Sequence, residues 1–80
     1  MTTLDARRLS CPLPLVLARR RMRELAAGER LRVLVTDPEA PIDLAAFAAD
    51  EGHGFRELGP RDAGGAPAAS WLELELRKGD

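Results

Sequence analysis

The sequence predicts an α/β protein: a two-layer α/β sandwich with the order βαβαββ, in which a four-stranded mixed sheet carries two helices on one face. The first reason is length, because 80 residues correspond to one domain over residues 1–80. The second is that segments of strand and helix periodicity alternate along the chain. The third is that two strands alternate apolar and polar side chains, so the sheet has one solvated face and both helices cover the other.

The first expected elements are a short strand over residues 2–6 and an amphipathic helix over residues 13–27. No glycine interrupts the helical segment, and Gly28 follows it as a C′ residue. Its apolar side chains recur at spacings of three and four: Leu15, Ala18, Met22 and Leu25. Pro12 and Pro14 mark the helix start, because the amide hydrogens missing there would have no acceptor within the helix.

A second strand is expected over residues 30–36, where apolar and polar side chains alternate. The dipeptide Asp37-Pro38 ends it. A second helix follows over residues 41–51, and Gly52 closes that segment.

The carboxyl-terminal part is expected to add two strands. Residues 55–58 form a short strand, and residues 59–69 form a loop rich in glycine and proline. Leu72, Leu74 and Leu76 alternate with charged residues, which predicts a closing strand.

Composition excludes several classes of protein. Hydrophobic residues make up 45% and charged residues 31%, and the net charge of -1 argues against a general nucleic-acid binder. No apolar stretch is long enough to span a bilayer, and residues 1–10 lack the apolar core of a targeting segment. A single cysteine cannot form an internal disulfide, which favours a reducing compartment and a cytoplasmic location.

Cys11 is the candidate for covalent chemistry, because it lies at or beside the N-cap of the first helix. The partial positive charge of a helix N-terminus stabilises a thiolate and lowers the pKa of a cysteine placed there. Arg7 and Arg8 add favourable charge, while Asp5 offsets part of it. We therefore expect the pKa of Cys11 to lie below that of a free cysteine.

The opposing interpretation is that Cys11 is a buried, inert side chain, as many free cysteines are. Pro12 and Pro14 argue for a function, because two prolines this close stiffen the segment and fix the direction of the thiol.

Residues 4–7 (Leu-Asp-Ala-Arg) and 9–14 (Leu-Ser-Cys-Pro-Leu-Pro) resemble the signature of the TusA/SirA-like sulfur-carrier family. Further segments fit the pattern of the family at its spacing: residues 28–31, 36–38, 43–44 and 51–53. The resemblance covers residues 3–58 and the last strand. One departure is Arg8, where the family usually has glycine.

The resemblance implies the same βαβαββ sandwich and a carrier function for Cys11. Such a carrier takes up sulfane sulfur as a persulfide from a cysteine desulfurase or rhodanese-like donor and relays it to an acceptor protein. The pathways it implies are tRNA thiolation, molybdenum cofactor synthesis and sulfur oxidation. The residues that support the thiol are Asp5, Arg7, Pro12 and Pro14.

With no second cysteine, the acceptor must supply the next thiol or electrophile. The chain is then a sulfurtransferase-type carrier rather than a stand-alone enzyme, and we expect no cofactor. Two alternatives stay open: a non-catalytic regulatory or protein-interaction module, and a single-thiol redox sensor.

A basic cluster on the first helix is either a solvated face or a docking surface for an acidic partner. Its members are Arg19, Arg20, Arg21 and Arg23. An apolar contact around the thiol is expected from Leu13, Val16 and Leu17. Direct nucleic-acid binding is not expected, because the chain has three aromatic residues and no interleaving of basic and aromatic side chains.

The remaining candidates have structural explanations. His53 is expected to close the second helix, with a role as catalytic base for Cys11 as the alternative. Asp37 and Asp43 flank the start of that helix, where a carboxylate interacts favourably with the dipole. Trp71 falls out of phase with the leucines of the last strand and is expected on the open side of the sheet. One cysteine and one histidine give no recognisable zinc spacing, so we expect no metal.

Overall fold

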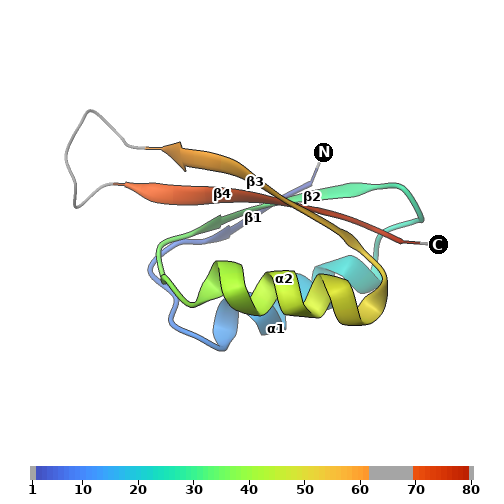
Figure 1. Cartoon of the computed structure of the whole chain (residues 1–80), viewed down its shortest axis with the longest axis horizontal. Coiled ribbons are helices and arrows are strands. Elements are labelled where there is room, and N and C mark those ends of the chain that lie inside the picture. The colour runs from blue at the N-terminus through green and yellow to red at the C-terminus, as the bar shows by residue number, and fades with distance from the viewer. Residues whose placement is uncertain (1, 62–69, 80) are drawn as a thin grey trace.

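The computed structural model describes residues 2–61 and 70–79 and has two layers, a sheet above a pair of helices (Figure 1). The elements in chain order are β1 (Thr2–Ala6), α1 (Leu13–Arg23), β2 (Arg30–Val35), α2 (Ala40–Glu51), β3 (Gly54–Arg61) and β4 (Trp71–Arg77). The strands lie in the order β1-β2-β4-β3. β1 pairs with β2 in parallel, and the other two pairings are antiparallel. The predicted fold class and element order are confirmed.

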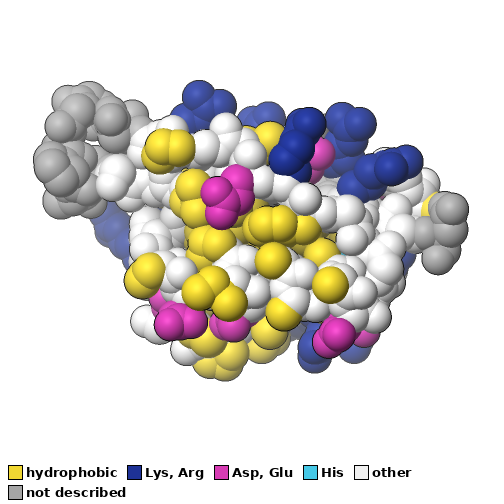
Figure 2. Space-filling view, in the orientation of Figure 1, with side chains coloured by type: hydrophobic (Ala, Val, Ile, Leu, Met, Phe, Trp, Pro, Cys, Tyr) yellow, Lys and Arg dark blue, Asp and Glu magenta, His cyan; other side chains and the backbone are white. Residues whose placement is uncertain are grey.

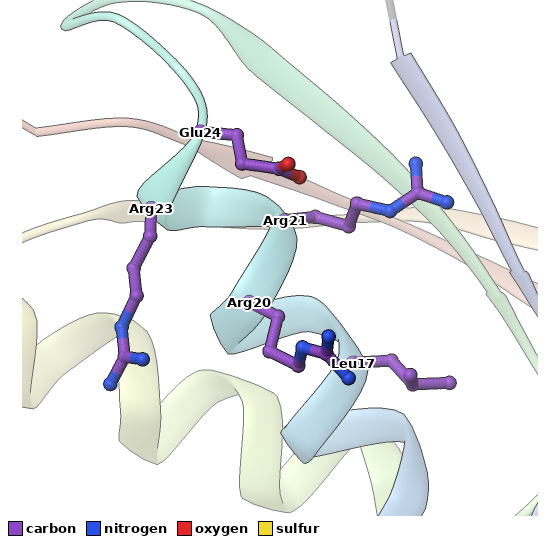
Figure 3. Close-up of a pocket in the computed structure, with 5 residues that line it drawn as sticks. All are labelled: Leu17, Arg20, Arg21, Arg23 and Glu24. Atoms are coloured by element: carbon purple, nitrogen blue, oxygen red, sulfur yellow. The ribbon is translucent and has the colours of Figure 1, made fainter.

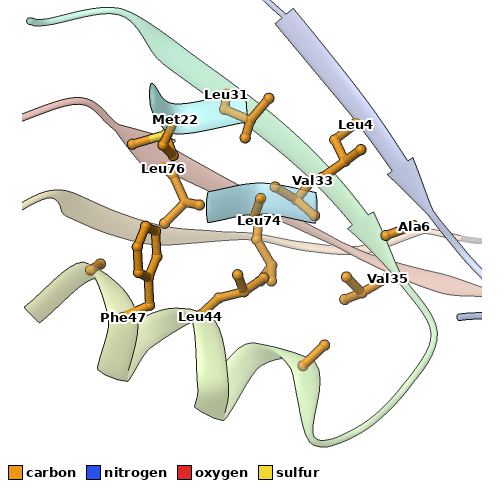
Figure 4. Close-up of a cluster of buried hydrophobic side chains, with 13 residues drawn as sticks. Leu4, Ala6, Met22, Leu31, Val33, Val35, Leu44, Phe47, Leu74 and Leu76 are labelled. Atoms are coloured by element: carbon orange, nitrogen blue, oxygen red, sulfur yellow. The ribbon is translucent and has the colours of Figure 1, made fainter. Parts of the chain in front are cut away.

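The core fills the space between the sheet and the helices (Figure 4). Alternation along β2 and β4 turns one set of side chains toward the helices, and each helix contributes one apolar stripe. The fully buried large side chains are Met22, Leu31, Val33, Val35, Leu44, Leu74 and Leu76. Burying each such aliphatic side chain contributes about 1.5–3 kcal/mol. The core therefore holds the helices against one face and leaves the opposite face of the sheet to solvent.

The first helix is shorter than the periodicity predicts. It ends at Arg23 rather than Ala27, because the amides of Glu24 and Leu25 bond to carbonyls three residues back, which tightens the last turn. Leu25 still packs partly against the core. The predicted boundary was wrong by one helical turn.

The expected loop over residues 59–69 is wrong for its first three residues, which belong to β3. β3 lies at the edge of the sheet, where the missing amide hydrogen of Pro60 costs no ladder bond. The pairing with β4 shifts between Glu57 and Gly59, and Gly59 has a φ of 120° that suits glycine. Residues 62–69 lie outside the described residues.

Both helices begin at the same end of the molecule (Figure 1). α2 begins at Ala40 and ends at Glu51. Gly52 follows it in the left-handed conformation expected of a glycine that caps a helix. Within residues 2–61 and 70–79, no helix is both long and apolar enough to cross a membrane.

Candidate functional site

Cys11 lies in the loop between β1 and α1, directly before the N-cap residue Pro12. Its side chain is exposed, so the expectation of a buried cysteine is wrong. Pro14 occupies the first turn of α1 and is buried, which fixes the helix start against the core. The predicted position of Cys11 beside the helix start is confirmed.

The start of α2 supplies two carboxylates to this cysteine. The thiol of Cys11 donates a hydrogen bond to Asp43 Oδ2, with Sγ and Oδ2 2.7 Å apart. The backbone amide of Cys11 donates to Asp37 Oδ2 at 2.7 Å, while Asp37 Oδ1 accepts from the amide of Glu39 at 2.9 Å. Asp37 thus ties the cysteine loop to the α2 start, and Asp43 contacts the sulfur itself.

These contacts reverse the predicted electrostatics of the thiol. The hydrogen bond to Asp43 is the main cause that raises the pKa of Cys11 to about 11, followed by partial desolvation and by the nearby negative charges of Asp43, Asp37 and Glu39. The prediction of a lowered pKa was wrong. The helix N-terminus does favour anions, but the anions gathered here are carboxylates, which hold the proton on the sulfur.

Arg7, one of the two arginines expected to favour the thiolate, is engaged elsewhere. Arg7 donates from Nε and from Nη2 to the two carboxylate oxygens of Asp5, at 2.9 Å each. This hydrogen bonding lowers the pKa of Asp5 to about 2. The guanidinium of Arg7 also stacks 4.8 Å from the ring centroid of Trp71. Asp5 and Arg7 therefore bond to each other and contact Trp71 at the end of the sheet, and they are not among the groups that shift the pKa of the sulfur.

Arg8 has a φ of 70°, which makes it the one non-glycine residue with a positive φ in the described part of the chain. Its amide donates to Thr36 Oγ1 at 2.8 Å, which anchors the loop to the end of β2. A left-handed backbone is the conformation that glycine adopts most readily. The geometry thus explains why glycine suits this position.

Exposed apolar side chains lie near the starts of both helices. Leu13 is 48% exposed, Val16 is 43% exposed and Ile42, next to Asp43, is 64% exposed. They are the large hydrophobic side chains exposed within residues 2–61 and 70–79. Leu17, by contrast, packs partly against the core. Ile42 was not among the apolar contacts expected from the sequence, although a large aliphatic residue off the core stripe of the second helix was a usable signal.

Three arginines of α1 line one pocket together with Leu17 and Glu24: Arg20, Arg21 and Arg23. Arg20 lies beside Leu17, Arg21 extends toward the sheet, and Arg23 points toward α2 (Figure 3). Arg19 lies over the ring of Phe47, with its guanidinium carbon 5.8 Å from the centroid. Arg19 is exposed, and it covers the seam between the helices.

His53 closes the far end of α2. Its amide donates to the carbonyl of Ala48 at 2.8 Å, and its Nδ1 accepts from the amide of Gly79 at 2.9 Å. Eight residues of helix, about 12 Å, separate Glu51 from Asp43 at the thiol end. The expected closing role is confirmed, and this placement does not fit a catalytic base for Cys11. Within the described segments, no group of three or more His, Cys, Asp or Glu residues is placed to hold a metal.

The fold and the site define a class of protein: a small α/β sandwich with one exposed thiol where two helices begin. A family model described as "Sulfurtransferase TusA" matches residues 2–66. The chain belongs to this family, and the resemblance to TusA/SirA-like proteins is confirmed. The SirA-like protein from Desulfitobacterium hafniense has a similar structure, with a TM-score of 0.79 and 26% identity over the full length of both chains.

Curated relatives match about two thirds of the chain. "Sulfur carrier protein TusA" of Pseudomonas entomophila is 45% identical over 51 residues, 64% of this chain and 64% of that protein. The protein of the same name from Allochromatium vinosum is 39% identical over 54 residues, 68% of this chain and 71% of that protein. The Bacillus subtilis protein YrkF is 44% identical over 52 residues, 65% of this chain but 28% of that protein.

Proposed function

We propose that this protein is a sulfur carrier that accepts sulfane sulfur as a persulfide on Cys11 and relays it to an acceptor protein. The donor is a cysteine desulfurase or a rhodanese-like protein. The family membership and the names of the relatives support a carrier role. The observation that carries the proposal is the exposed thiol of Cys11, 2.7 Å from Asp43 Oδ2 at the joint start of two helices.

Transfer requires a change of protonation at the sulfur. The proton of Cys11 passes to Asp43 Oδ2, and the Sγ electron pair attacks the terminal sulfur of the donor persulfide. The new Sγ–S bond forms as the S–S bond of the donor breaks, and the departing donor thiolate takes up the proton. Sulfane sulfur moves from one cysteine to another, so no external oxidant or reductant is consumed.

The donor has to supply the activation, because a pKa of about 11 leaves roughly one thiol in ten thousand ionised at pH 7. A cationic group of the donor placed beside Sγ stabilises the forming thiolate and so lowers the pKa of Cys11. Leu13, Val16 and Ile42 provide the apolar contact that excludes water from this junction. The thiol of the free carrier is then a poor nucleophile until a partner docks.

Loading changes the site. Once Sγ is bonded to the incoming sulfur it has no proton to donate to Asp43, and the reactive atom lies about 2 Å beyond Sγ. Repulsion between the carboxylate and an ionised persulfide directs the terminal sulfur away from Asp43 and toward the acceptor. The acceptor serves tRNA thiolation, molybdenum cofactor synthesis or sulfur oxidation, and the chemistry suits the predicted reducing, cytoplasmic environment.

A raised pKa also bears on the redox-sensor alternative. Redox-sensing cysteines are accessible and have low pKa values, because the thiolate is the form that oxidises. Cys11 is accessible, but its bond to Asp43 keeps the thiol protonated. This combination favours a carrier that a partner activates over a sensor that reacts directly with oxidants.

Mass spectrometry tests the proposal. After incubation with a cysteine desulfurase and cysteine, the chain should gain the mass of one sulfur, and a reductant should remove it. Cys11→Ser is the matched control, because its hydroxyl retains a hydrogen bond to Asp43 but cannot form a persulfide. We expect complete loss of the adduct with circular dichroism unchanged. An adduct on the serine variant, or none on the parent with desulfurase and rhodanese-like donors alike, would favour the regulatory module instead.

A further inference from the structure

The face of the sheet opposite the helices is strongly basic. Strand alternation places five arginines on it, from β2, β3 and β4: Arg30, Arg32, Arg56, Arg61 and Arg77. Two glutamates of β4, Glu73 and Glu75, are the acidic side chains that these three strands place among the arginines in the described segments. In Figure 2 most of the visible Lys and Arg side chains gather along the sheet side of the molecule. This face therefore carries an excess of positive charge in a chain whose net charge is -1.

The two glutamates neutralise only part of the arginine charge. Glu75 lies 4.0 Å from Arg30 and 3.7 Å from Arg56. Glu73 lies 3.8 Å from Arg32 and 3.4 Å from Arg61. These separations exceed the roughly 2.7–3.2 Å of a direct N–H···O bond, so the guanidinium groups keep donors for other acceptors.

Two details indicate that this face lacks a counter-charge. Arg30 and Arg77 are directly opposite each other in the β2–β4 register, and like charges so placed destabilise a sheet. Within the described residues, the Nε of Arg32 is buried and has no hydrogen-bond acceptor. An acidic partner would supply a counter-charge to Arg30 and Arg77, and the Arg32 side chain, which is 42% exposed, keeps outer guanidinium donors for the same partner.

We propose that this open face, defined by the five arginines, docks an acidic surface of a partner protein. Arginine presents a planar pair of donors that matches a carboxylate, and the Glu73 and Glu75 contacts at 3.7–3.8 Å leave such donors unused. RNA fits the face less well, because single-stranded RNA binds by stacking on exposed aromatic rings. The aromatic residue of this face, Trp71, is covered by the guanidinium of Arg7 at 4.8 Å.

Docking on this face leaves the helix layer uncovered, because α1 and α2 lie on the other side of the sheet (Figure 1). A partner held there leaves Cys11 accessible to a second protein. The proposal does not depend on persulfide chemistry, and a carrier that failed to load sulfur would still bind through this face.

Poly-L-glutamate of defined length serves as the probe, with an oligouridylate of equal charge for comparison. The triple variant Arg56→Gln, Arg61→Gln, Arg77→Gln should bind poly-L-glutamate about tenfold more weakly than the parent at low salt. Its matched comparison is Arg20→Gln, Arg21→Gln, Arg23→Gln, which removes the same charge from α1 and should weaken binding of poly-L-glutamate by much less than the sheet-face variant does. Amide chemical shifts should change along β2, β4 and β3 and not along α1.

Each other outcome overturns the proposal. Equal loss in the two triple variants would mean that only net charge matters. Tighter binding of the oligouridylate, lost in the sheet-face variant, would assign the face to RNA. No binding of poly-L-glutamate by the parent at low ionic strength would show that the arginines are simply solvated.

Discussion

Carboxylates act differently at the thiol end and on the open sheet face. At the thiol end, Asp37 and Asp43 accept hydrogen bonds from Cys11 at 2.7 Å. On the sheet face, Glu73 and Glu75 lie between arginines at 3.4–4.0 Å. A carboxylate bonded to a neutral thiol changes which form of that thiol exists, whereas a carboxylate between permanent cations only reduces their net charge.

The same comparison shows that a chain with a net charge of only -1 has an acidic region at the thiol end and a basic region on the open sheet face. The starts of α1 and α2 attract anions, and the residues that gather there are Asp37, Glu39 and Asp43. The five arginines of β2, β3 and β4 lie on the solvated face of the sheet, away from those helix starts. One end of the molecule is thus suited to a cationic group of a partner and the opposite layer to an acidic surface.

The largest expected effect comes from removing the carboxylate that contacts the sulfur. Asp43→Asn should lower the pKa of Cys11 from about 11 toward the ordinary value near 8.5. A fall of one to two units increases the thiolate fraction at pH 7 about 10–100-fold. The rate of alkylation by iodoacetamide across pH 6–11 measures this directly. In the parent, the contribution of the thiol–carboxylate bond to stability is present below about pH 8.5 and is lost as the pH rises through about 11.

Glu75→Gln is the control that ties the effect to the thiol end. It removes a carboxylate of the same charge from the sheet face, between Arg30 and Arg56. The alkylation midpoint of Cys11 should not move. If both variants shift it equally, the raised pKa reflects the net charge of the molecule and the comparison between the two regions fails.

An intermediate effect is expected on α1, between the two regions. Arg20→Glu with Arg23→Glu should slow sulfur transfer about tenfold at low ionic strength, because an acidic donor is steered less effectively. The effect should shrink as salt is raised. Arg19 is omitted because it covers Phe47 between the helices.

The matched control for this pair is Arg20→Lys with Arg23→Lys, which retains the charge and should transfer sulfur at the parental rate. Alkylation of Cys11 should be the same in all three proteins. Transfer at the parental rate by the reversed variant in low salt would identify these arginines as a solvated face. Docking would then depend on Leu13, Val16 and Ile42.

The fold was predictable because its determinants are local. The alternation in β2 and β4 and the apolar stripes of α1 and α2 are visible in short windows. Motif spacing likewise placed Cys11 beside the start of a helix. The wrong start of the loop reflects an edge position: β3 continues through Gly59 and Pro60, which an edge strand tolerates.

The protonation of the thiol was not predictable in this way. The bond from Cys11 to Asp43 joins residues 32 positions apart, and it exists because α1 and α2 begin side by side. The helix N-terminus near the cysteine predicted a lowered pKa for Cys11, but a carboxylate within hydrogen-bonding distance raises that pKa instead. From the sequence, the favourable interaction of Asp43 with the dipole of α2 was a sufficient explanation for this residue. Only the fold shows that Asp43 also contacts Cys11.

The smallest expected effect concerns Arg8, in the loop that joins the sheet to the thiol end. At a φ of 70°, the Cβ of this residue causes steric strain that glycine would not have. The greater freedom of glycine in the unfolded chain offsets part of that difference. Arg8→Gly should therefore raise the free energy of unfolding by about 0.5–1 kcal/mol, which corresponds to a few degrees in Tm for a domain of this size. Ser10→Gly, in the same loop but without a positive φ, should lower it by a similar amount.

Thermal unfolding of the three proteins measures the difference, and alkylation of Cys11 shows whether the loop also tunes the thiol. The amide of residue 8 keeps its bond to Thr36 Oγ1 whatever the side chain, so the loop path and the contact between Cys11 and Asp43 should persist. The alkylation midpoint should therefore match the parent. A destabilised Arg8→Gly protein would mean that the arginine side chain stabilises the fold by more than its backbone strain costs. A shifted midpoint would mean that the charge of Arg8 acts on the sulfur, and the thiol end would then not be governed by its carboxylates alone.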